Sequence, residues 1–438
     1  MRRRRFLRRS GLVAGGLGLL PERVASDDTA ANSQGTPTSS PRETTPVAEG
    51  TAPLGRLPIG GLREVVTSPD GETAYCATTD GFAVVDLGDP AAPEVVHENR
   101  EPWAGAGNGR LEQVYDVKFD RTADLLAVVG PANPRDVFQG LVVYDVSDRT
   151  APERVAVHET RSFNHNCFAT DGHVYLPENT KERNSLVVVD ARAGEAVGRW
   201  SIADVDERWT EVGPNWVLHD IHVHDGVAYL AHWDAGTWAV DVSDPAAPEL
   251  LARIRGRDAA TFAEMPRAEA RRDYSEPPGN DHYTATNEDG DLLGIGVEAW
   301  DTDTADDAGG PGGITLYDVS DLSAPEKLAF IEPPPTPDPT LGGTWTTSHN
   351  FRFRGTASTP PGTRAASAST TSRTRPSLHC WHAGATATLR ACGPRCPPAT
   401  ASSSSPPATG TDRAPPRTAP PSAPRSTPSP TRPRTPRP

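Results

Sequence analysis

The chain has 438 residues and a formal net charge of −15, from 58 acidic and 43 basic side chains. Six arginines before residue 10, and eleven arginines with one aspartate after residue 355, mask a more acidic centre, since the residues between them carry 57 acidic and 26 basic side chains. Such a surface repels nucleic acid and anionic lipid, which we exclude as partners. Its self-repulsion needs screening, so we expect a halophilic protein whose fold depends on molar salt.

The first 55 residues have the composition of an export signal and a linker. Residues 1–26 are a basic run followed by a short apolar segment that is too short to span a bilayer. The sequence RRRFL from Arg3 resembles the twin-arginine signal, and Val24-Ala25-Ser26 suits a cleavage site. Residues 27–55 are rich in Ser, Thr and Pro, which predicts a disordered linker. We therefore expect an exported protein, extracellular or attached to the cell surface, with no transmembrane span in its mature body.

One nine-residue pattern recurs along the centre of the chain. It reads DLGDPAAPE from Asp86, DVSDRTAPE from Asp145, DVSDPAAPE from Asp241 and DVSDLSAPE from Asp318. Each copy follows an apolar, β-branched run: FAVVD, LVVYD, TWAVD and ITLYD. A repeated motif separated by segments of variable length predicts one supersecondary unit used several times.

Each unit reads as four strands. In the clearest copy, LHDIHVH and VAYLAHW flank a tight Asp225-Gly226 turn, and GTWAVDV and PELLARI flank the repeated pattern. The fold class is therefore all-β, a β-propeller of four-stranded antiparallel blades. The sequence contains five recognisable blades and the first strand of a sixth, and we expect the complete propeller to have six or seven. A β-sandwich is the alternative, which the regular motif disfavours.

The repeats resemble the LVIVD-repeat family, whose name matches a degenerate fifth copy, LVVVD, ending at Asp190. The resemblance covers residues 56–355, and the acidic surface suits a haloarchaeal member. It implies an exported β-propeller and implies little about chemistry, because a fold does not determine a function.

Residues 356–438 break the pattern with Pro, Ser, Thr and Arg runs that have no period. We expect a disordered tail. Reverse translation in the third-base frame can restore a copy of the repeated turn after Thr356, so we interpret the tail as out of frame, with a frameshift near Gly355. The cysteines and histidines of the tail are then not a metal site.

Polar residues recur at one position, the start of the first strand of each unit. Aligning the units gives Arg63, Tyr115, His165, His219, His282 and His349. First strands of a propeller are innermost, so these residues should surround one mouth of the central channel. Antiparallel second strands end at the same mouth and contribute Glu178, His232 and Glu298.

Histidine and glutamate ligands suit a transition metal such as copper, zinc or iron. The candidate metal residues are His165, His219, His232, His282, His349, Glu178 and Glu298. Asp220, Asn166 and Asn350 are expected to orient the imidazoles. His222 and His224 alternate to the opposite face and should be solvated. The alternative is a polar mouth that binds no ion.

These observations leave three functions open. The first is an extracytoplasmic binding or scaffold protein, monomeric, with a protein, glycan or small-molecule partner. The second is a metal-dependent oxidoreductase or hydrolase that uses the histidine-lined mouth. The third is a purely structural cell-surface role. The sequence has no nucleophile elbow, phosphate-binding loop or dinucleotide fingerprint.

Overall fold

The structure is a computed structural model that describes residues 54–103, 109–180, 182–302, 309–354, 377–380 and 388–391. The expected signal segment, nearly all of the linker, the frameshift position and most of the tail lie outside these residues. Two segments of the tail, β23 (Ser377–Cys380) and β24 (Thr388–Ala391), are strands, which the expectation of an unstructured tail did not include.

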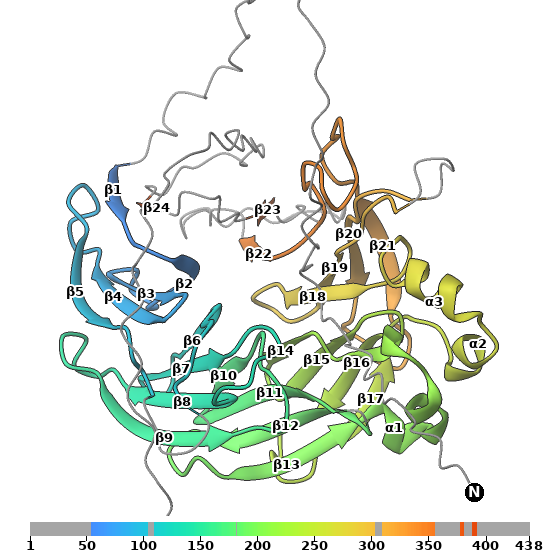
Figure 1. Ribbon diagram of the computed structural model, residues 1–438, viewed down its shortest axis with the longest axis horizontal. Coiled ribbons are helices and arrows are strands. Elements are labelled where there is room, and N and C mark those ends of the chain that lie inside the picture. The colour runs from blue at the N-terminus through green and yellow to red at the C-terminus, as the bar shows by residue number, and fades with distance from the viewer. Residues whose placement is uncertain are drawn as a thin grey trace, which may run out of the picture. The chain divides into compact units, whose positions relative to one another are not determined.

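Five four-stranded antiparallel sheets follow one another along the chain, each built from consecutive strands (Figure 1). The first two are β2 (Leu62–Thr67), β3 (Thr73–Thr78), β4 (Gly81–Asp86) and β5 (Glu94–Asn99), and β6 (Asp116–Asp120), β7 (Leu125–Gly130), β8 (Gly140–Asp145) and β9 (Glu153–Glu159). The third and fourth are β10 (Phe168–Thr170), β11 (His173–Asn179), β12 (Asn184–Asp190) and β13 (Ala196–Ser201), and β14 (Asp220–His224), β15 (Val227–His232), β16 (Gly236–Asp241) and β17 (Glu249–Arg253). The fifth is β18 (Asp281–Thr286), β19 (Leu292–Val297), β20 (Ile314–Asp318) and β21 (Glu326–Ile331).

These sheets are the blades of a β-propeller, as the repeats predict. The first strands of consecutive blades, β2, β6, β10, β14 and β18, pack against one another in chain order. The next strand, β22 (Phe351–Arg354), packs on β18 and pairs with β23. Asn350, which precedes β22, donates a hydrogen bond of 3.3 Å to Glu64 on β2, so the sixth segment contacts the first blade. A separate pair joins β1 (Gly55–Pro58) to β24.

Helices occupy two connections between blades. The one from β13 to β14 holds α1 (Ile202–Val205) and the 3₁₀ turns η1 (Glu207–Glu211) and η2 (Pro214–Trp216). The one from β17 to β18 holds α2 (Ala259–Ala263) and α3 (Arg267–Asp273). Among the described residues, no helix has both the length and the apolar character needed to cross a membrane.

The repeated pattern forms the turn between the third and fourth strands of a blade. In the fourth blade, Asp241 accepts hydrogen bonds from the backbone N–H (2.9 Å) and the hydroxyl (2.6 Å) of Ser243. Asp244 accepts the N–H of Ala246 at 3.0 Å. Short acidic side chains stabilise turns by accepting the N–H two residues ahead. The same turn in each blade therefore uses the same aspartates. The same bonds form at Asp145 and Asp148, and at Asp318 and Asp321.

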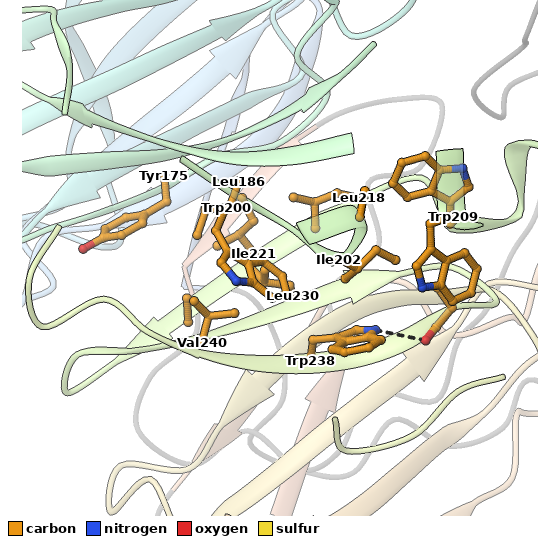
Figure 2. Close-up of a cluster of buried hydrophobic side chains, with 14 of the residues drawn as sticks. Tyr175, Leu186, Trp200, Ile202, Trp209, Leu218, Ile221, Leu230, Trp238 and Val240 are labelled. Atoms are coloured by element: carbon orange, nitrogen blue, oxygen red, sulfur yellow. Dashed lines mark hydrogen bonds between the residues drawn. The ribbon is translucent and has the colours of Figure 1, made fainter. Parts of the chain in front are cut away.

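The core lies mainly between neighbouring blades. Figure 2 shows the cluster between the third and fourth blades, where aliphatic side chains from both sheets meet the indoles of Trp200, Trp209 and Trp238. The indole N–H of Trp238 donates to the carbonyl of Ala235 at 3.0 Å, so burying this ring leaves no donor unpaired. Every blade therefore depends on its neighbour to bury its apolar face.

Candidate functional site

Six side chains at the starts of the first strands form a continuous row at one mouth of the channel. The guanidinium of Arg63 lies 4.5 Å from the ring centre of Tyr115. Onward from Tyr115, successive ring centres are 6.2, 5.2, 3.7 and 4.7 Å apart. The four imidazoles, which we call the histidine row, are His165, His219, His282 and His349. The structure thus brings together four residues that are far apart in the sequence.

One end of the histidine row forms a possible ligand set. The ligand atoms of His282, Glu298 and His349 all lie within 4.8 Å of one another, and these three are the only such group of His, Cys, Asp or Glu in the described part of the chain. Nδ1 of His282 is 3.2 Å from the Glu298 carboxyl, and Nε2 of His349 is 3.8 Å from it. His282 is the second residue of β18, Glu298 follows β19, and His349 precedes β22, so the group joins the fifth blade to the sixth segment.

Hydrogen bonds determine which ring nitrogen is available in most of the row. Nδ1 lies 2.9 Å from the Ala132 carbonyl in His165 and 3.0 Å from the His282 carbonyl in His219. In His349, Nδ1 lies 2.7 Å from the side-chain oxygen of Asn350. Because carbonyl oxygens only accept, Nδ1 of His165 and of His219 carries the proton and Nε2 keeps its lone pair. For His219 the carbonyl contact at 3.0 Å is shorter than the contact of Nδ1 with the Asn166 amide nitrogen at 3.4 Å. Such orientation by a neighbouring oxygen is typical of histidines that ligate metals.

Two of the three members, His282 and Glu298, are buried, whereas the His349 side chain is 41% exposed. Burial lowers the pKa of His282 well below its usual value and raises that of Glu298 to about 8. Both nitrogens of His282 are buried, and within the described residues neither makes a hydrogen bond of good geometry, although Nδ1 lies 3.2 Å from Glu298. A divalent cation between these side chains would favour the carboxylate form of Glu298 and accept the lone pairs of neutral imidazoles.

Glu178 and His232 do not join this group, which differs from the expectation that they lie beside the row as ligands. Burial alone would raise the pKa of Glu178, but hydrogen bonds from Arg161 and Arg199 lower it to about 2. His232 is fully buried, and its Nδ1 contacts the Trp216 carbonyl at 3.1 Å. Glu178 and Nδ1 of His232 have partners that the alternation of the strands did not reveal, whereas Nε2 of His232 is buried with no hydrogen-bond partner among the described residues.

Of the three residues expected to orient the imidazoles, two lie beside the histidine row and one does not. Asn350 contacts His349, and Asn166 donates to the backbone carbonyl of His219 at 3.0 Å. Asp220 instead faces the fifth blade, where it accepts the N–H of Thr284 at 3.3 Å. Burial raises the pKa of Asp220 to about 8.

His222 is half-buried and hydrogen-bonded, which differs from the prediction that it is a solvated strand residue. Its Nε2 accepts the backbone N–H of Thr286 at 3.2 Å, and its ring lies edge-on to Phe168 at 5.1 Å. Burial lowers its pKa to about 3. Neighbouring blades therefore cover this face of β14 in part. His224, nearer the far end of the strand, is partly exposed.

A charged cluster that sequence reasoning missed lies further along the first strands. The ammonium of Lys118 contacts the Asp116 carboxylate and lies 3.8 Å from Glu64. Asp116 also accepts the N–H of Cys167 on the third blade at 2.8 Å. Alignment of the units could have found this cluster, because Glu64 and Asp116 each follow a residue of the mouth row. Cys167 itself is a buried free thiol, as is Cys76.

A comparison with protein-family models agrees with the repeat. The family model described as LVIVD repeat matches residues 218–255, which make up the fourth blade. A search of curated proteins gave no match. Among solved structures, the chain is similar to the β-propeller domain of Cps50 (Swd1) from Myceliophteria thermophila, with 11% identity over 62% of this chain and 69% of that one, and a TM-score of 0.41. It is also similar to the computationally designed Ika8 protein (9% identity, 67% and 65% coverage, TM-score 0.40) and to Kuenenia stuttgartiensis hydrazine synthase (10%, 66% and 69%, TM-score 0.38).

Proposed function

We propose that this LVIVD-repeat β-propeller is an extracytoplasmic binding protein that holds one divalent transition-metal ion at its channel mouth. The ligands are His282, Glu298 and His349. The proposal depends on one observation, the convergence of two imidazoles and one buried carboxyl within 4.8 Å of one another. No basic side chain causes the pKa shift of Glu298, for which burial is the cause.

The donor set limits the choice of metal. Two imidazoles and one carboxylate bind zinc in hydrolytic sites and iron(II) in oxygen-using sites, and both kinds of site leave a coordination position open. Imidazole also suits copper. Calcium and magnesium are disfavoured, because they prefer sites made of oxygen atoms.

Location outside the cytoplasm is supported by the sequence. The twin-arginine-like start precedes a body rich in acidic side chains and poor in lysine. Fractionation of the native host should find the protein outside the cytoplasmic membrane. Changing Arg3 and Arg4 to lysine should retain it inside the cell, and export that is insensitive to this change would contradict a twin-arginine route.

A bound metal would serve two of the three roles that the sequence leaves open. In a binding or scaffold protein it would fix the mouth and contact the partner, whereas in an oxidoreductase or hydrolase it would act on a substrate at its open position. The deciding measurement is turnover by the metal-loaded protein, compared with the metal-free form.

The metal site is tested by stoichiometry. Protein purified in molar salt is stripped with a chelator, dialysed against zinc, and analysed for metal by mass spectrometry. We expect about one zinc per chain, and a loss of at least tenfold in affinity in H282A, H349A and E298Q, since each removes a ligand. H173A is the matched control, because His173 starts β11 at the end remote from Glu178 and the mouth. Zinc binding that survives all three ligand changes would refute the site.

A further inference from the structure

Asn280 lies two residues before the proposed ligand His282, in a backbone conformation that few residues adopt. Its φ angle is +63°, in the left-handed region where asparagine is enriched and bulky side chains are rare. The residue is only 4% exposed, so contact with water does not account for its polar side chain. A buried asparagine in this conformation indicates a local geometric requirement at the start of β18.

The pairing of β18 with β19 is interrupted at His282. Asp281 is opposite Val297, and Tyr283 is opposite Gly296. His282 is therefore an extra residue in its strand, which makes this position a β-bulge. A bulge bends its strand and changes the direction of the side chain, and bulges are frequent beside active sites. The segment that leads into this bulge thus determines where the imidazole points.

Asn280 also holds the main chain of a second proposed ligand, Glu298. The side-chain amide of Asn280 donates to the Glu298 carbonyl at 2.5 Å, and the Glu298 N–H donates to the Asn280 carbonyl at 3.3 Å. The pairing of the two strands ends at Asp281 and Val297, so these bonds extend it to Glu298. Within the described part of the chain, the Glu298 carboxyl makes its polar contacts with the other two proposed ligands. Its position therefore depends on the main chain that Asn280 holds.

The fourth blade anchors Asn280 in turn. The N–H of Asn280 donates at 3.2 Å to the carboxylate of Asp234, which lies two residues after β15. The Asp234 side chain is fully buried and also accepts from Arg257 at 3.1 Å and from Asn215 at 2.8 Å. Gly279 permits this close approach, because a Cβ there would lie 1.6 Å from an oxygen of Asp234. Asn280 thus connects the fourth blade to the ligands of the fifth.

The amide of Asn280 is not arranged for the greatest stability. Its Oδ1 is buried and has no hydrogen-bond partner among the described residues. An unpaired buried acceptor is unfavourable, and such groups are uncommon in folded proteins. The bond from the amide nitrogen to Glu298 is a reason for a polar side chain at this position despite that cost.

We propose that Asn280 is a positioning residue for the metal site. Its amide holds the main chain of Glu298, and its left-handed backbone leads into the bulge that directs His282 towards the Glu298 carboxyl. Asn280 acts through these two ligands and is not a ligand itself. The inference rests on the proposed function, because it concerns the placing of the same ligands.

Two substitutions separate the amide from the backbone conformation. N280G removes the amide but keeps the left-handed conformation, which glycine adopts without steric cost. It should weaken zinc binding by the full chain about tenfold, the usual effect of losing a group that orients metal ligands. N280A also opposes the left-handed conformation and should weaken binding further. Competition with a chelator of known zinc affinity, in molar salt, measures both.

D225G is the matched control. Asp225 also has a left-handed backbone, with a φ angle of +45°, and its side chain is exposed in the turn after β14, at the end of that strand remote from the mouth. Its replacement should leave zinc affinity unchanged. Cobalt(II) in place of zinc gives a visible absorption spectrum that depends on ligand geometry. This spectrum should change in N280G and stay the same in D225G.

A role of Asn280 in folding alone would give a different result. N280G would then lower the urea midpoint of the metal-free protein, while its zinc affinity and cobalt spectrum matched those of the wild type. That outcome would overturn the inference. If N280A does not fold by circular dichroism, N280G decides by itself.

The inference and the proposed function fail in different ways. If the wild type binds one zinc through its three ligands and N280G binds it equally well, only the role of Asn280 is overturned. If the wild type binds no zinc, the metal site and the role of Asn280 are both overturned.

Discussion

The fourth and fifth blades have equivalent outer strands with unequal burial. Ile254 directly follows β17 and is only 9% exposed. It is buried because Leu293, Ile295 and Tyr317 of the fifth blade pack against it. The corresponding Ile331 on β21 is 37% exposed. A blade therefore encodes its own strands, but the burial of its outer face depends on the blade that follows.

The same contrast extends across the whole of β21. All six of its residues are exposed, including Leu328 and Phe330 at 45% each. The apolar cluster on the inner part of this blade gains Phe351 and Phe353 from β22, so only the part near the channel is covered by the sixth segment. We refer below to the covered side, around the inner strands and the blade interfaces, and to the uncovered side, along β21.

The two sides should differ most in how much the free energy of unfolding falls when a lysine is replaced. K118M leaves the buried Asp116 without its cation, and removing one partner of a buried pair costs about 3–5 kcal/mol. K327M, on the exposed β21, should change the free energy of unfolding by less than about 0.5 kcal/mol. Urea unfolding in molar salt measures both. Equal losses would show that the inner strands are not the covered side.

The paired isoleucines provide the next comparison. I254A removes side-chain atoms from a packed interface and should lower the free energy of unfolding by about 2–4 kcal/mol, whereas I331A should cost less than about 1 kcal/mol. The same urea experiment applies. A large loss in I331A would mean that another surface covers β21 in solution.

Two glutamates at corresponding strand ends should differ in their response to acid. Glu178 is the penultimate residue of the second strand of the third blade and has a pKa of about 2, whereas Glu298 directly follows the second strand of the fifth blade and has a pKa of about 8. Because folding lowers the pKa of Glu178, its contribution is complete above about pH 4.5 and disappears as the pH falls towards 2.

The variant E178Q should therefore be less stable than the wild type by about 1–3 kcal/mol at neutral pH, a range reduced for the exposure of Arg161 and Arg199. The difference should shrink between pH 4.5 and 2, as followed by urea midpoints. A difference that does not vary with pH would mean that Glu178 acts through packing and not through its charge.

Replacing a turn aspartate should have the smallest effect on the free energy of unfolding, and the effect should be equal in the fourth and fifth blades. D241A and D318A each remove the aspartate that accepts the N–H two residues ahead, in the fourth and fifth blades respectively. We expect both to cost on the order of 1 kcal/mol, because the lost hydrogen bonds are local to the turn. Unequal losses would show that the turn, too, depends on the next blade.

Local patterns account for most of what could be predicted about the site. Alternation and turn chemistry placed His165, His219, His282 and His349 at equivalent positions, and the structure brings these four together. Glu298 was found at the end of a second strand by the same logic. Which of these side chains meet one another, and which bind elsewhere, could not be predicted, because every neighbour in question comes from another part of the chain.

The sequence by itself determined the four-stranded unit, the aspartate turns and the order of residues around the mouth, since each depends on bonds between residues close in the chain. The tertiary structure decided the partners. Glu178 is neutralised by Arg161 and Arg199, and His222 is covered by Phe168 and Thr286, so neither behaves as its strand position alone suggests. The physical reason is that burial and charge compensation are set by which blades pack together, and a side chain's distant neighbours are not encoded in its local period.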